Sequence, residues 1–141
     1  GEVARITCEG CSMDGVDTAL SANAYYYCDW DGHSAAVQNR SPAPVTELTP
    51  SVHNITVKDC DVRNLRLAFA AVLGLSERPI LDVSIARVTV SFDPDARAAP
   101  PLMADNIPAL RHVGIWSEFA DVTCDDAPDL SASTSTPMSN A

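Results

Sequence analysis

The chain of 141 residues carries 9 basic and 19 acidic residues, which gives a formal net charge of −10. Domains run to roughly 100–200 residues, so this length suits a single domain. A strongly acidic surface argues against nucleic acid, whose phosphates require clustered Lys and Arg, and against anionic membrane surfaces. No apolar run approaches the roughly 20 residues that a membrane-spanning helix needs. We therefore expect no nucleic acid and no membrane among the partners of this chain.

Four short segments share one pattern, in which a polar residue is followed by Ile or Val, then by Thr or Ser, then by a small apolar residue. They read RITCEGCSM from Arg5, NITVKDCDV from Asn54, DVSIARVTV from Asp82 and DVTCDD from Asp121. Apolar side chains at every second position predict strands with one face turned inward. The copies align on their first apolar residues, which are Ile6, Ile55, Val83 and Val122.

Similar residues at equal offsets from these positions predict that the segments stack on one another. Two residues further on lie Cys8, Val57, Ile85 and Cys124. Small and β-branched side chains of this kind suit parallel strands about 4.8 Å apart. Unequal separations between the copies are typical of a solenoid whose turns carry long insertions. The sequence therefore predicts an all-β solenoid of about four coils over residues 1–126.

The segments between the repeats are predicted from composition and spacing. Residues 64–75 have apolar side chains at helical spacing, but Gly and Pro residues stop the segment directly before the third repeat. We therefore predict a strand there, and another over residues 18–27. Residues 29–51 and 93–112 are rich in Pro and small polar residues and are expected to form loops. Residues 127–141 have the composition of a flexible tail.

The five cysteines include one close pair, Cys8-x-x-Cys11, which invites a zinc or redox interpretation. A zinc site needs four ligands, and neither a second such pair nor a His pair completes the set. The redox interpretation requires a thioredoxin-like βαβ setting, which the predicted strands do not offer. We therefore expect neither a metal nor another cofactor, and interpret the cysteines as small apolar members of the inward stacks.

Longer stretches of the sequence resemble a known family. Three stretches carry the resemblance: ALSANAYYYCDWDG, VQNRSPAPVTELTPSVHNITVKDCDVRN and AAVLGLSERPILDVSIARVTVSF. Together they resemble bacterial glycoside hydrolase family 28, the polygalacturonases and related pectin-degrading enzymes. The most specific pieces are YYYC, VQN, TPxxxNI and GLSERPI, and the resemblance extends from Val3 to Asp126. It implies a right-handed parallel β-helix of the pectin-lyase-like type, of which this chain forms the C-terminal coils. It also implies an extracellular or periplasmic location for the parent protein.

The resemblance further implies a reaction that this chain does not carry out alone. Members of the family hydrolyse the α-1,4 bond of galacturonan with inversion, using carboxyl groups far enough apart to admit a water. Their motifs Asn-Thr-Asp, Asp-Asp, Gly-His-Gly and Arg-Ile-Lys are not found here in the family order. Arg5-Ile6-Thr7 lacks the lysine, and Asp125-Asp126 follows the fourth repeat. No catalytic residue is assigned, and galacturonan or an oligogalacturonide is expected as a ligand through the parent enzyme.

One substrate contact of the family, a tyrosine on the strand after the Arg-Ile-Lys coil, is expected within this chain. Counting along the coil from Ile6 places it at Tyr27, with Tyr25 on the same side of the expected strand as the reserve candidate. The alternative is that these tyrosines cap a coil, with amphipathic rings whose hydroxyls reach water. Loops near this strand also supply contacts in the family, which makes a further set plausible as substrate-binding residues: Asp29, Trp30, His33, Gln38 and Asn39.

Three interpretations of function stay open from the sequence. The chain is the C-terminal segment of a pectin-degrading hydrolase, a non-catalytic β-helix module that binds acidic oligosaccharides, or a structural solenoid that associates with itself. The net charge of −10 disfavours the second, because galacturonate carboxylates require Arg or Lys partners. Under all three, the open edge of the first strand, residues 3–8, predicts dimerisation or aggregation.

Overall fold

The chain forms an all-β fold, as the sequence predicts, in a computed structural model that describes residues 1–27 and 29–130. Its strands are β1 (Glu2–Glu9), β2 (Ser12–Asp14), β3 (Thr18–Asn23), β4 (Ser51–Leu65), β5 (Ala68–Leu73), β6 (Ile80–Phe92), β7 (Val113–Glu118) and β8 (Ala120–Asp125). Its short helices are the 3-10 helices η1 (Trp30–His33) and η2 (Pro128–Leu130) and the α-helix α1 (Ala35–Gln38). None of these helices has the length or the apolar composition needed to cross a membrane.

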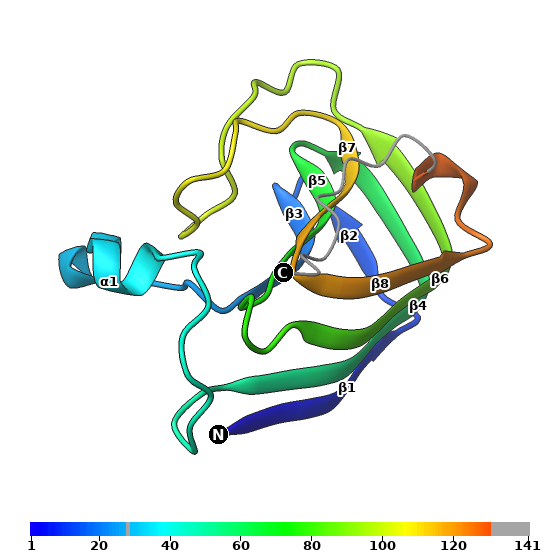
Figure 1. Ribbon diagram of the computed structural model, residues 1–141. Helices are drawn as coiled ribbons and strands as arrows, with labels where there is room; N and C mark the ends of the chain where they lie inside the picture. The colour runs from blue at the N-terminus through cyan, green and yellow to red at the C-terminus, as the bar shows by residue number, and fades with distance from the viewer. Residues whose placement is uncertain (28, 131–141) are drawn as a thin grey trace.

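The strands form two parallel sheets, and the chain alternates between them (Figure 1). One sheet has the order β1-β4-β6-β8, with β2 also paired to β4, and the other has the order β3-β5-β7. Parallel neighbours cannot be joined by a tight hairpin and need a longer crossover. Here a strand of one sheet forms part of each crossover between neighbouring strands of the other sheet. Both sheets are therefore built by the same turns of the chain.

The four repeats stack in the register on which the sequence aligns them. One row of paired residues consists of Ile6, Ile55, Val83 and Val122. A second row consists of Met13, Val62 and Val90. Because each row holds similar side chains, neighbouring layers present the same inward profile to the core. The predicted stacking of parallel strands is thereby confirmed.

The main core cluster takes its fully buried side chains from β4, β5 and β6. Every residue of β5, Ala68–Leu73, is buried, so this strand has apolar side chains on both faces. A strand of that kind shows no alternation of apolar and polar residues, which is why its sequence also fits helical spacing. The strand predicted for this segment is confirmed, because β3 and β7 supply backbone partners on its two sides.

The tyrosine run and the first long loop differ from the prediction. The strand expected over residues 18–27 stops at Asn23, so Tyr25 and Tyr27 follow β3 instead of continuing it. The side-chain oxygen of Asn23 accepts a hydrogen bond from the backbone N–H of Tyr25 at 2.8 Å, a local turn that leads the chain away from the sheet. Within the loop predicted over residues 29–51, the short helices η1 and α1 form.

The first residues of the predicted flexible tail, 127–130, pack onto the sheets. Helix η2 contacts β6 in one sheet and β7 in the other. Leu130 is 3% exposed, and the Asp129 carboxylate accepts a hydrogen bond from the backbone N–H of Val90 at 3.2 Å. Helix η2 therefore fills the opening of the core at the β7–β8 end. Residues 131–141 of the predicted tail lie outside the described part of the chain.

The bends of the strands are built from stacked residues in the left-handed backbone region. Three rows of such residues follow from the register: Arg5, Asn54 and Asp82; Gly10, Asp59, Arg87 and Asp126; and Gly15 with Asn64. Gly adopts positive φ without a steric cost, and Asn and Asp tolerate it better than other residues. Arg87 does not share this tolerance, but its Nε donates to Asp59 Oδ1 in the adjacent layer at 2.6 Å. The corners therefore depend on backbone conformation and on polar contacts between layers.

Asn64, with φ of 52°, tests the contribution of these corners. We expect Asn64→Ala to be less stable than Asn64→Gly by about 1 kcal/mol, because Cβ meets the following carbonyl in the left-handed region. Both variants lose the hydrogen bond from Asn64 Nδ2 to Asp14 Oδ1 at 2.8 Å, so their difference reports the backbone alone. Urea unfolding followed by circular dichroism measures it. Equal stabilities would contradict the role given to the corner.

Candidate functional site

All of the predicted site residues lie in residues 24–40, and Arg40 ties this segment to two other parts of the chain. The guanidinium carbon of Arg40 lies 3.8 Å from the centroid of the Tyr25 ring. Its Nη2 donates to the backbone oxygen of Asp105 at 2.9 Å, and its Nε lies 3.9 Å from Glu118 Oε1. Nothing in the sequence singles out Arg40, because its partners Asp105 and Glu118 lie far along the chain.

Gln38 holds the same segment together from inside. It is 5% exposed, and its Nε2 donates to the backbone oxygens of Tyr25 at 2.7 Å and Gly32 at 2.9 Å. A Cβ added at Gly32 would lie 1.9 Å from the Cβ of Tyr27, so this position has no room for a side chain. Gln38 and Gly32 therefore shape the segment, and a direct contact between Gln38 and substrate stays a prediction.

Tyr27 and His33, both predicted site residues, lie together at the surface with Asp105. The Tyr27 and His33 rings have centroids 3.8 Å apart and planes tilted by 46°. His33 Nδ1 lies 2.6 Å from Asp105 Oδ2, and about half of the His33 side chain is exposed (48%). This group is open to a ligand. The sequence did not reveal Asp105, since no motif surrounds it.

The two tyrosines differ in accessibility but share one protonation state. Burial raises the pKa of Tyr25, while the nearby Arg40 guanidinium opposes that rise. Desolvation also raises the pKa of Tyr27, and the Asp105 carboxylate raises it further through its charge and a hydrogen bond. Both phenols therefore stay protonated at neutral pH and act as neutral hydrogen-bonding groups. The Tyr25 hydroxyl is buried and has no hydrogen-bond partner within residues 1–27 and 29–130.

The remaining predicted residues lie apart from this group. Trp30 is 83% exposed. Asp29 and Asn39 are also exposed, and both take part in local turns: the backbone oxygen of Asp29 accepts from the N–H of Gly32, and Asn39 Oδ1 accepts from that of Ser41. Their contact with a substrate stays a prediction. Trp30 alone of the three offers a large apolar surface to a ligand.

A groove of about 530 Å³ runs along β3 and is closed on one side by residues 101–103. We call it the β3 groove, and its lining residues are Asp17, Thr18, Ser21, Asn23, Tyr26, Pro101, Leu102 and Met103. Asn23 Nδ2 donates to the backbone oxygen of Met103 at 2.7 Å, which fixes the loop against the strand. The Tyr26 ring is 55% exposed and forms part of the wall. Sequence reasoning missed this groove because its two walls are distant in the chain.

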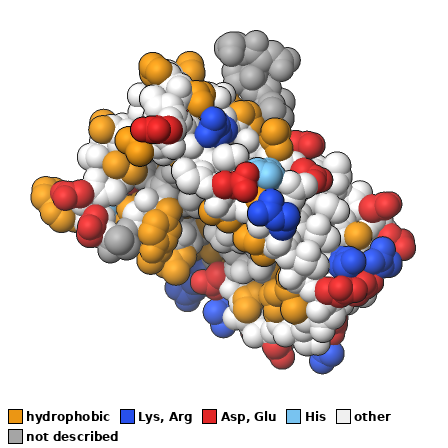
Figure 2. All heavy atoms as spheres, turned by 90° about the horizontal axis from the view of Figure 1, so that it is seen from below, with side chains coloured by type: hydrophobic (Ala, Val, Ile, Leu, Met, Phe, Trp, Pro, Cys, Tyr) orange, Lys and Arg blue, Asp and Glu red, His pale blue; other side chains and the backbone are white. Residues whose placement is uncertain are grey.

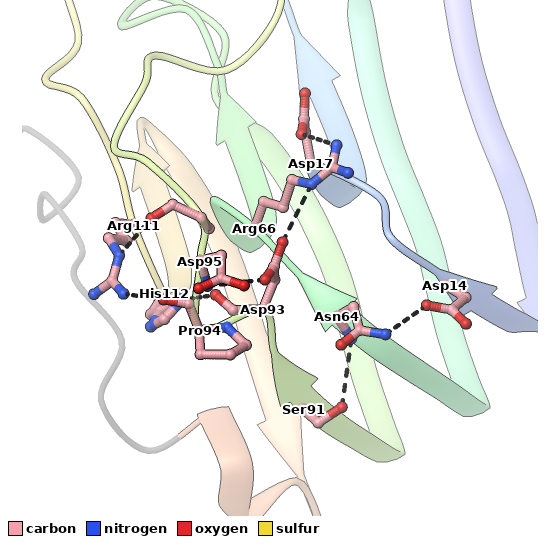
Figure 3. Close-up of polar contacts among 11 residues, drawn as sticks. Asp14, Asp17, Asn64, Arg66, Ser91, Asp93, Pro94, Asp95, Arg111 and His112 are labelled. Carbon is pink, nitrogen blue, oxygen red and sulfur yellow. Dashed lines mark hydrogen bonds and ion pairs between the residues drawn. The ribbon is translucent and has the colours of Figure 1, made fainter.

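The charge of the β3 groove is set at one end by Asp17 and its neighbours (Figure 3). Arg66 points between two carboxylates, with Nη1 3.3 Å from Asp17 Oδ1 and Nε 3.6 Å from Asp93 Oδ2. The Asp93 backbone oxygen also accepts from His112 Nε2 at 2.7 Å. The lining residues given above include a carboxylate but no Arg, Lys or His. The groove is therefore better suited to an uncharged ligand rich in hydroxyls than to an anion.

One cluster of side chains within the described part of the chain could hold a metal ion. The Sγ atoms of Cys8, Cys11 and Cys60 all lie within 4.8 Å of one another. A hydrogen bond with Cys11, burial and the neighbouring Cys60 raise the pKa of Cys8 to about 12. Cys124 lies opposite Ile85, as the repeat predicts, but is exposed on β8. Cys28 lies outside the described residues.

Comparisons with known proteins add no family or relative to this description. No family model matches the chain, and neither curated proteins nor solved structures give a match. The assignment of function therefore depends on the repeats, the β3 groove and the group around Arg40.

The influence of Asp105 on Tyr27 can be measured directly. We expect Asp105→Asn to lower the pKa of Tyr27, because removing a negative charge makes the phenolate easier to form. Tyrosinate absorbance during an alkaline titration, with the signal of Tyr27 identified by Tyr27→Phe, measures the change. Asp29→Asn removes a carboxylate from the same surface segment and serves as the control. An unchanged pKa in Asp105→Asn would contradict the contact between Asp105 and Tyr27.

Proposed function

We propose that this chain is the C-terminal segment of a polygalacturonase-like glycoside hydrolase, in which it forms coils of a right-handed parallel β-helix. The observation that carries the proposal is the in-register stacking of parallel strands that alternate between two sheets. A β-helix requires this arrangement. Parallel strands joined by a crossover are right-handed in about 98% of cases, which supports the handedness.

The carboxylates on the strands favour a non-catalytic part in that enzyme. A hydrogen bond from Arg87 lowers the pKa of Asp59. Hydrogen bonds from Thr89 and then Arg63 lower the pKa of Asp61. A glycosidase needs one carboxylic acid with a raised pKa to protonate the leaving oxygen. Asp59 and Asp61 are thus unsuited to that task.

The β3 groove is the surface that best fits a sugar chain. Tyr26 offers an exposed aromatic face, and the exposed Ser21 hydroxyl offers hydrogen bonds. Amphipathic rings and a few fixed polar groups are the usual lining of a binding site. Since Arg66 is already engaged by two carboxylates, the groove favours uncharged, esterified galacturonate units over free ones.

The test has two readouts on the purified chain. Polygalacturonate and digalacturonate are assayed for release of reducing sugar, and we expect none with the native chain or with Tyr27→Phe. Binding of methyl-esterified and unesterified oligogalacturonides is measured by calorimetry. We expect the methyl-esterified oligogalacturonide to bind more tightly than the unesterified one. Tyr26→Ala is expected to weaken its affinity by about 10-fold, which corresponds to a loss of about 1.4 kcal/mol of binding free energy. Trp30→Ala removes an exposed predicted site residue outside the groove and therefore distinguishes the β3 groove from residues 29–39 as the binding surface.

Two outcomes of this test would contradict the proposal. Release of reducing sugar that is abolished by Asp29→Asn or Asp31→Asn would place a complete active site within this chain. Weaker binding in Trp30→Ala and unchanged binding in Tyr26→Ala would move the sugar from the β3 groove to residues 29–39.

A second behaviour, self-association, is favoured by the open end of the two sheets. β1 and β3 are the edge strands at this end, and Val3 and Ile6 on β1 are 48% and 47% exposed. They border a hollow of about 330 Å³ whose other lining residues include Leu20, Val52 and Ile55. Figure 2 looks at the molecule from below, the side of β1 in Figure 1, and shows hydrophobic side chains among charged ones. An uncovered edge of this kind pairs with other chains.

For the chain on its own, the occupant we propose for this face is a second copy of the chain. Because η2 packs on β6 and β7 at the opposite end, the two ends of the stack differ, and pairing of two like open ends closes into a dimer. Light scattering is expected to show a dimer for the native chain and a monomer for Ile6→Lys, which places a charge in the interface. Leu48→Lys, at an 84% exposed position, is expected to stay dimeric. A native monomer at high concentration would contradict association.

A further inference from the structure

Three thiols from two layers of the fold meet at one corner near the open end. Cys8 lies on β1, Cys11 follows it at the turn into β2, and Cys60 lies on β4. The Sγ atoms lie within 4.8 Å of one another, and those of Cys8 and Cys11 are 2.7 Å apart. Cys60 is 4% exposed, whereas Cys8 and Cys11 are partly exposed. The cluster is thus held by the core on one side and reachable on the other.

The fold brings these residues together through the corner and the register. Gly10, with φ of 68°, turns the chain between Cys8 and Cys11, so that both side chains face the interior. The pairs on either side, Glu9 with Lys58 and Ser12 with Asp61, place Cys11 opposite Cys60. The repeat aligns Cys60 with Cys11 in the next copy, but the sequence does not show that the Sγ atoms of Cys8, Cys11 and Cys60 meet.

The sulfur positions are close to those of a three-coordinate metal centre. Metal–thiolate bonds of about 2.3 Å place three sulfurs roughly 4 Å apart around a shared ion. The separations in the cluster are compatible with this figure after Cys8 and Cys11 move apart by about 1.3 Å, the difference between 2.7 Å and that spacing. The partial exposure of both side chains leaves room for such a rotation. The hydrogen bond from Cys11 Sγ to the backbone oxygen of Glu9 is long, at 3.7 Å, and presents little obstacle.

The donor set selects the kind of ion. Thiolates prefer soft ions such as Cu(I) and Zn(II). A structural zinc site takes four protein ligands, and no His, Asp, Glu or further Cys joins these three within the described ranges. We propose that Cys8, Cys11 and Cys60 form a binding site for a soft monovalent metal ion of low coordination number, represented by Cu(I). The acidic chain, with a net charge of −10, favours the approach of a cation. This site does not depend on the proposed sugar-binding function.

The test is an anaerobic titration of the reduced full chain with Cu(I) against the chelator bicinchoninate. We expect one equivalent to bind, with ultraviolet thiolate-to-copper absorption. Cys8→Ser and Cys11→Ser are each expected to weaken binding by at least about 100-fold, because losing even a group that only hydrogen-bonds to a metal ligand costs about 10–100-fold. Cys124→Ser, at an exposed thiol outside the cluster, is expected to bind as the native chain does.

A second measurement distinguishes the loss of metal binding from misfolding of a variant. Cu(I) is expected to raise the Tm of the native chain and of Cys124→Ser, but not that of Cys11→Ser, whose own folding is checked by circular dichroism. Three results would overturn the proposal: no binding in competition with the chelator, unchanged binding in Cys11→Ser, or a Cys8–Cys11 disulfide that persists in thiol reductant. Tighter binding of Zn(II) than of Cu(I), each measured by chelator competition, would overturn the assigned class of ion.

Discussion

In-register pairing of β4 with β1 on one side and β6 on the other brings like residues together across the layers of the fold. The backbone bonds of a parallel ladder do not by themselves select a register, because a shift along the strand still pairs N–H with C=O. The inward side chains select it, since a slip by one residue would turn Val57 and Ile85 toward solvent. The left-handed corners reinforce this choice, as they coincide between layers only in the observed register.

The two ends of the stacked strands differ in how completely their core side chains are covered. At the β7–β8 end, Leu130 of η2 fills the core, and Asp129 accepts from a backbone N–H of β6. At the β1–β3 end the inward row begins with Ile6, which the next layer covers on one side only. The same incomplete cover leaves Cys8 and Cys11 partly exposed while Cys60, one layer deeper, is buried. A reachable trio of thiols and an apolar open face thus have one structural origin.

The strands could be predicted from the sequence because the repeat expresses two constraints at once, inward alternation and matching between layers. The segment 68–73 was predictable only from its neighbours, since its complete burial removes the alternation that marks a strand. The end of β3 was not predictable in this way. Asn23 both ends the strand and anchors the loop at Met103, and the second contact depends on residues 80 positions away. Arg40 and Asp105 escaped notice for the same reason.

The β3 groove and the Tyr27–His33 pair depend on contacts between residues 23–40 and the loop at 101–105. Arg40 bonds the backbone of Asp105, His33 contacts its carboxylate, and Asn23 holds Met103. These bonds place the wall of the β3 groove and the exposed Tyr27–His33 pair on one rigid support. Loops carry function when a scaffold fixes them, and here the scaffold is the stacked register itself. A ligand lying along β3 would therefore meet groups positioned by strands, although none of the groups at Tyr26, Tyr27 and His33 belongs to a strand.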